Sequence, residues 1–258
     1  MALKMTLSSS ESPLAHGIAG LLGHRRAQLD YLMYLFMQAV VVFVWWPKNS
    51  LREVLTAGNG PDTLLAAVLA AGFASAWFSA RAGAQELLAP RQRGLHEWAA
   101  HTPVAPARLL GADLAAQLLH TLHLLALSAP LLLMAFAVSG GDPGALAWCV
   151  SAIVVQAIFY RLAAACVCLF IGPQRAMTVV LVRAIVIAGY LLTAVFVPAA
   201  SHLVLAWRLL DQAPQVPHAE AALLFMLVYG ALSALLAALL VARIARLRRD
   251  RTPAEAAA

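Results

Sequence analysis

Long uninterrupted runs of apolar residues, separated by short polar segments, dominate the pattern of this chain. Six such runs can be read, over residues 29–46, 63–80, 109–138, 145–171, 177–200 and 219–242. A helix needs about 18 to 20 residues to cross the ~30 Å hydrocarbon core of a bilayer. The pattern therefore predicts an all-α integral membrane protein, with a six-helix transmembrane domain over residues 29–242.

The segments that flank this domain differ from it in composition. Residues 1–28 place Leu14, Ile18, Leu21 and Leu22 at helical spacing among polar residues, which predicts a cytoplasmic N-terminus with an amphipathic helix in the membrane interface. A disordered arm with a helical start is the alternative. Residues 243–258 form a basic cytoplasmic tail that can contact anionic lipid.

The loop before the last run, residues 201–218, is itself partly apolar around Trp207. Such interrupted hydrophobicity is typical of a short re-entrant or interfacial segment, with the tryptophan at headgroup depth. A ragged extension of the fifth run is the other interpretation, and the sequence does not choose between them. The third and fourth runs join through Ser139–Gly144, whose glycines and proline predict a tight reversal.

Composition and charge support the membrane assignment. The chain is 62% hydrophobic and 12% charged, whereas soluble domains have about 45–50% apolar and about 25% charged residues. Lys and Arg retain short loops on the cytoplasmic side. An N-terminus in the cytoplasm places most of them there, at positions 4, 25, 26, 81, 91, 93, 108, 175, 243, 246, 248, 249 and 251, and leaves only 48, 52 and 208 outside.

This asymmetry predicts that both termini are cytoplasmic. It also accounts for the formal net charge of +6 without nucleic-acid binding. The start of the chain lacks the compact apolar segment and cleavage site of a signal peptide. We expect a multi-pass protein of a bacterial cytoplasmic (inner) membrane.

The sequence contains few groups that could perform catalysis. Its only lysines, Lys4 and Lys48, lack the Gly-x4-Gly-Lys-Ser/Thr context of a phosphate-binding loop. The three cysteines, at positions 149, 166 and 168, fall in one apolar run and predict neither a disulfide nor a metal site. His120 and His123 share a helix face. They are expected to line a dimer interface or a translocation route, with a metal site that includes Asp113 as the minor alternative.

Two arginines, Arg161 and Arg183, lie inside apolar runs, where a central charge costs at least ~2.5–3.5 kcal/mol. Both fall in the cytoplasmic half of the predicted topology, so we expect their side chains to extend to the inner surface. The functional alternative is that they face a vestibule and attract an anionic headgroup. Asp113 and Gln156 are the candidate partners of these arginines within the bundle.

A polar segment, Arg91–Pro103, separates the second and third runs. Gly94 permits a sharp change of chain direction, and Leu95–His101 can then form a short surface helix that ends at Thr102-Pro103. Such a helix would present Arg91, Arg93 and Glu97 to the cytosol and Trp98 to the membrane interface. This arrangement predicts a docking surface for a partner.

The same segment resembles the stretch between the second and third spans of the type-2 ABC exporter permeases. The resemblance rests on six residues at the family's positions, namely Arg91, Arg93, Gly94, Glu97, Thr102 and Pro103. The number of spans, the interfacial N-terminal helix and the length agree, so the resemblance covers nearly the whole chain. Gln92, Trp98 and Asp113 depart from the family pattern.

The resemblance implies that this chain is the permease subunit of an ABC exporter. In that family the segment is a coupling helix, which fits a groove on a separate ATP-binding subunit. ATP and Mg²⁺ would bind to that partner, and this chain would hold no cofactor and no catalytic residue. Two permeases, in a homodimer or pseudo-dimer, would form the path. The alternatives are a haem-exporter-like permease of cytochrome c maturation, and a membrane-embedded enzyme or assembly factor that uses His120, His123 and Asp113.

Overall fold

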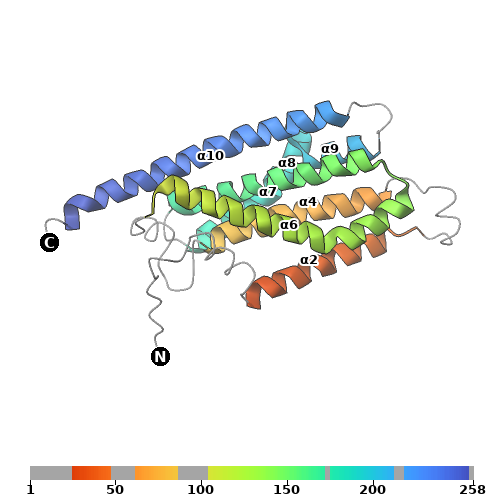
Figure 1. Ribbon diagram of the computed structural model, residues 1–258, viewed down its shortest axis with the longest axis horizontal. Helices are drawn as coiled ribbons and strands as arrows, with labels where there is room; N and C mark the ends of the chain where they lie inside the picture. Colours follow the sequence, from red (N-terminus) through yellow and green to blue (C-terminus); the bar gives the residue numbers. More distant parts are fainter. Residues whose placement is uncertain (1–24, 48–61, 87–103, 172–174, 212–217, 256–258) are drawn as a thin grey trace.

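The computed structural model describes residues 25–47, 62–86, 104–171, 175–211 and 218–255 of the chain (Figure 1). These residues form helices and no strand. The helices are α2 (Arg25–Val44), α4 (Asp62–Glu86), α6 (Pro106–Ser139), α7 (Pro143–Ile171), α8 (Arg175–Phe196), the 3-10 helix η1 (Pro198–Ala200), α9 (His202–Leu210) and α10 (His218–Glu255).

Four of these helices are long and apolar enough to cross a membrane. The apolar stretches are Asp62–Gly83, Pro106–Ser139, Pro143–Ile171 and Ala219–Arg249. Two more helices, α2 and α8, contain shorter apolar stretches, Gln28–Val44 and Val180–Phe196. The prediction of an all-α, multi-pass membrane protein is confirmed by these four membrane-length helices.

The centre of the bundle is formed by α4 and α7, which pack along each other and are surrounded by the other helices (Figure 1). In both, 61% of the membrane-length stretch is buried inside the protein, whereas only 17% of that of α10 is. Small residues such as Ala67, Ala71 and Ala152 are fully buried and let the two helices approach closely. The exposed apolar side chains of α2, α8 and α10 face outward, as a lipid environment allows.

The α6–α7 connection is the predicted tight reversal. Gly140 has a positive φ of 64° and ends α6, a conformation that glycine adopts without steric cost. The Asp142 carboxylate then accepts a hydrogen bond of 2.9 Å from the amide of Ala145. This side-chain cap starts α7 immediately after the turn.

The fifth predicted run is shorter in the structure. Helix α8 ends at Phe196 instead of residue 200, because Pro198 cannot continue an α-helix and disfavours helical backbone at the residue before it, Val197, which has φ −139° and ψ 70°. The hydroxyl of Ser201 then caps α9 by accepting from the amide of Val204. The segment that follows is therefore a separate, largely buried helix rather than a ragged extension of α8.

Helix α10 continues through most of the predicted basic tail and ends at Glu255. Its last turns lie at the same end of the bundle as the starts of α2 and α6 (Figure 1). A hydrogen bond of 2.7 Å from Arg248 Nη1 to the carbonyl oxygen of Val104 ties α10 to the start of α6.

Candidate functional site

A buried ion pair joins α6 to α7. The guanidinium of Arg161 donates from Nε to Oδ2 of Asp113 at 3.0 Å, and from Nη2 to Oδ1 of the same carboxylate. This two-point contact matches the planar fork of arginine to a carboxylate. The Arg161 side chain is 1% exposed and that of Asp113 27%, so the pair begins at the edge of the bundle and extends into it.

Gln117 extends this pair into a polar network. Its Oε1 accepts from Arg161 Nη1 at 2.9 Å, and its Nε2 donates to the hydroxyls of Ser79 and Thr121. Arg161, Gln117, Ser79 and Thr121 are all buried. Hydrogen bonds to every side of the guanidinium are what make a buried charge tolerable in a membrane protein.

Helix α4 passes very close to Arg161 of α7 at Gly83. A β-carbon at Gly83 would lie 2.8 Å from the carbonyl oxygen of Arg161 and 3.2 Å from its Cγ. Glycine is thus required for α4 to pass this close to α7 at the level of the ion pair. The network we call the Arg161 network comprises Arg161, Asp113, Gln117, Ser79 and Thr121.

The structure corrects our expectation for Arg161. Its side chain does not extend to the inner surface, because Asp113 and Gln117 satisfy its charge inside the bundle. Asp113 is the partner that we predict. The second predicted partner, Gln156, is buried beside Tyr160 and Tyr229 instead.

Arg183 lies on an exposed face of α8, with its guanidinium carbon 6.0 Å from the centre of the Trp77 ring. This distance is at the limit of a cation–π contact. The exposed position of Arg183 is compatible with a side chain that extends to the inner surface, which stays a prediction.

His120 and His123 both contact Tyr31 of α2. The ring centres of Tyr31 and His123 are 4.9 Å apart, and those of Tyr31 and His120 are 5.7 Å apart. Within the described residues no three His, Cys, Asp or Glu side chains come together as metal ligands. Asp113 is engaged by Arg161, whereas the two histidines pack against Tyr31.

A second polar contact, which sequence reasoning missed, lies near the other end of the bundle. The hydroxyl of Tyr190 in α8 lies 3.0 Å from both the carbonyl oxygen of Leu69 and Nδ1 of His202. His202 is fully buried, and burial lowers the pKa of its imidazole to about 4, so the ring is neutral at pH 7. A β-carbon at Gly72 would lie 2.5 Å from the His202 ring. These contacts fix α9 against α4 and α8.

The predicted coupling residues, Arg91, Arg93, Gly94, Glu97, Trp98, Thr102 and Pro103, lie outside the described residues. The helices on either side of them are described. Helix α4 ends at Glu86 and α6 begins at Pro106, and α4 and α6 pack against each other. The segment therefore connects the two helices that carry Ser79, Asp113 and Gln117 of the Arg161 network.

No family model, curated protein or solved structure matches this chain.

Proposed function

We propose that this chain is the transmembrane permease subunit of an ABC exporter of the type-2 fold. The observation that carries the proposal is the polar segment Arg91–Pro103, which has the residue pattern of a coupling helix and connects two apolar, membrane-length helices. ATP and Mg²⁺ would be bound by a separate ATP-binding subunit docked on this segment. The multi-pass helical fold is compatible with this role.

The same proposal places six spans in a bacterial inner membrane, with both termini in the cytoplasm. Four of the six are the membrane-length helices described above. The other two are α2, of 20 residues, and α8, of 22 residues. Their apolar stretches, Gln28–Val44 and Val180–Phe196, are each about 26 Å long at 1.5 Å per residue, near the lower limit of about 17 residues for a membrane span.

The Arg161 network gives the coupling segment a mechanical connection to the bundle. Force applied by an ATPase to residues 91–103 would act on the end of α4 and the start of α6. Asp113 and Gln117 lie about two and three turns into α6 and bind Arg161 of the central helix α7. We infer that the network makes α6 and α7 move together when the ATP-binding subunits close. Two permeases would then open a path between them.

Two substitutions in the segment test the proposal. Gly94→Val removes the conformational freedom at the turn, and Glu97→Arg reverses a charge on the docking surface. Both variants should insert normally, yet lose the coupling of ATP hydrolysis to transport. Asp211→Arg is the matched control, since it makes the same charge reversal at an exposed site after α9, toward the other end of the bundle. Normal partner binding and transport in both Gly94→Val and Glu97→Arg would refute a coupling role.

A further inference from the structure

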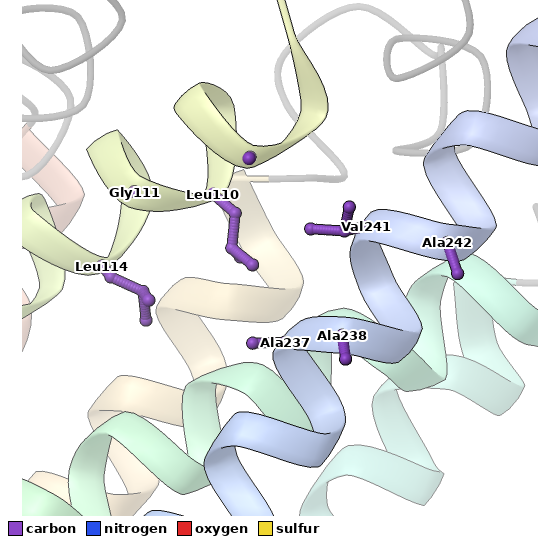
Figure 2. Close-up of a pocket in the computed structure, with 8 residues that line it drawn as sticks. Leu110, Gly111, Leu114, Ala237, Ala238, Val241 and Ala242 are labelled. Carbon is purple, nitrogen blue, oxygen red and sulfur yellow. The ribbon is translucent and has the colours of Figure 1, made fainter.

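A groove of about 480 Å³ lies between the start of α6 and the second half of α10 (Figure 2). Its walls are apolar, with Leu110, Gly111 and Leu114 on α6 facing Ala238 and Val241 on α10. In Figure 2, Leu110 and Leu114 point toward α10, and Val241 points back across the opening. The volume is within the range of roughly 300–1,000 Å³ that ligand sites have.

One end of this groove carries positive charge. Arg248 and Arg249 follow Val241 and Ala242 by seven residues, so they lie on the same face of α10 about 10 Å further along. Arg248 bonds to the carbonyl oxygen of Val104 and so bridges from α10 to the start of α6. On α6, Arg108 is exposed and follows the groove residue Ala107.

The start of α6 adds to this positive charge. Its first turn contains no acidic residue and includes Pro106, and its N-cap residue is Ala105, whose methyl side chain cannot accept a hydrogen bond from the first amides. The amides at a helix N-terminus carry partial positive charge and favour anions. One end of this apolar groove thus has Arg248 and Arg249 of α10 beside a helix N-terminus, and the exposed Arg108 lies on the adjoining face of the first turn of α6.

We propose that this groove binds one acyl chain of an anionic membrane phospholipid, whose phosphate lies at the arginine end. The charge complementarity identifies the occupant, because only a ligand with both a long apolar tail and an anionic head uses the groove and its end together. Helix α10 is the least covered of the membrane-length helices, so membrane lipid has direct access to it. The proposal does not depend on the transport function.

Glycines on the two helices provide a matched pair of variants. A β-carbon at Gly111 has no atom within 4 Å, so a larger side chain can start there without strain, and Gly111→Leu is expected to fill the groove that this residue lines. Gly230 on α10 is equally open, and lies seven residues, or about 10 Å, before the groove residue Ala237. Gly230→Leu therefore adds the same bulk to the same apolar surface without filling the groove. Ala238→Leu fills the groove from the α10 side.

The experiment is native mass spectrometry of the full-length chain in detergent, titrated with dioleoylphosphatidylglycerol or with dioleoylphosphatidylcholine. We expect one phosphatidylglycerol molecule to bind more tightly than phosphatidylcholine. Gly111→Leu and Ala238→Leu should lose this complex, and Gly230→Leu should keep it. The double variant Arg108→Gln/Arg249→Gln should bind phosphatidylglycerol roughly 30-fold more weakly, at about 1 kcal/mol per basic residue.

A matched charge control is Arg208→Gln, on the exposed side of α9. It should bind both lipids as the unaltered chain does. Equal binding of the two lipids, or an unchanged phosphatidylglycerol complex in both groove-filling variants, would overturn the proposal. If the groove-filling variants change only the ratio of monomer to dimer, the occupant is a second copy of the chain and the lipid site is rejected.

Discussion

Asp113→Asn removes the negative charge that faces the buried guanidinium of Arg161 while keeping the size of the side chain. Breaking a buried ion pair by removing one partner costs roughly 3–5 kcal/mol, because the remaining charge is left uncompensated. We expect the lower value, about 3 kcal/mol, since Gln117 still accepts from Arg161 Nη1 and the Asp113 side chain is 27% exposed. For a chain of this size each kcal/mol lowers Tm by roughly 2–4 °C. The expected loss is therefore about 6–12 °C.

The assay is thermal unfolding of the purified chain in detergent, followed by tryptophan fluorescence. A second change, Arg161→Met, removes the charge that has lost its partner and fills its space with an apolar side chain. Replacing a buried ion pair by apolar side chains of similar size often leaves the stability unchanged. The double variant Asp113→Asn/Arg161→Met should therefore recover most of the lost Tm. Asp211→Asn, at an exposed carboxylate, should change Tm by less than about 2 °C. A small effect of Asp113→Asn, or strictly additive losses in the double variant, would refute the coupling of these two side chains.

Three further predictions concern packing and topology. Gly72→Ala places a methyl group against the His202 ring and should lower Tm, and His202→Ala in the same chain should restore part of the loss; no recovery would argue against this contact. In Gly83→Ala the added methyl group clashes with a backbone carbonyl of α7 that cannot move alone, whereas in Gly111→Ala the added carbon has open space. The Tm of Gly83→Ala should therefore be lower than that of Gly111→Ala, and equal Tm values would contradict this. A topology reporter inserted at Gly141 should be external and one fused to the C-terminus cytoplasmic, and the reverse labelling would invert the proposed orientation.

The hydrophobic pattern predicts the all-α, multi-pass class correctly because a membrane span is a local property of about 20 consecutive residues. Its boundaries fail where one residue interrupts an apolar run. Pro198 is the example, since the residues around it remain apolar and hydropathy alone extends the span to residue 200. Turn chemistry is also local, which is why the glycines of the α6–α7 connection predict the reversal correctly.

The Arg161 network is only partly visible in the sequence. Asp113 is predicted as a partner because few carboxylates lie inside apolar runs. Gln117 lies four residues later and therefore on the same helix face, which is a local signal that it could join Asp113 in binding an arginine. Ser79 gives none, because its role depends on how α4 packs against α6.

The contact between Tyr190 and His202 is even less predictable from the sequence than the Arg161 network. Its members come from α4, α8 and α9, and they meet only after the chain has reversed at Pro198 and packed α9 back into the bundle. Glycine occurs in many apolar helices, so nothing in the sequence around Gly72 indicates that it packs against the His202 ring. Such contacts follow from tertiary packing and not from periodicity.

The claim that an ATPase docks on residues 91–103 is tested most directly by purifying the chain from its native membrane and identifying what is bound to it. We expect a stoichiometric partner whose sequence contains Gly-x4-Gly-Lys-Ser/Thr, and whose association is weakened by Glu97→Arg but not by Asp211→Arg. Isolation of the chain with a tightly bound metal ion and no nucleotide-binding partner would contradict the permease proposal. That result would favour a membrane-embedded enzyme or assembly factor.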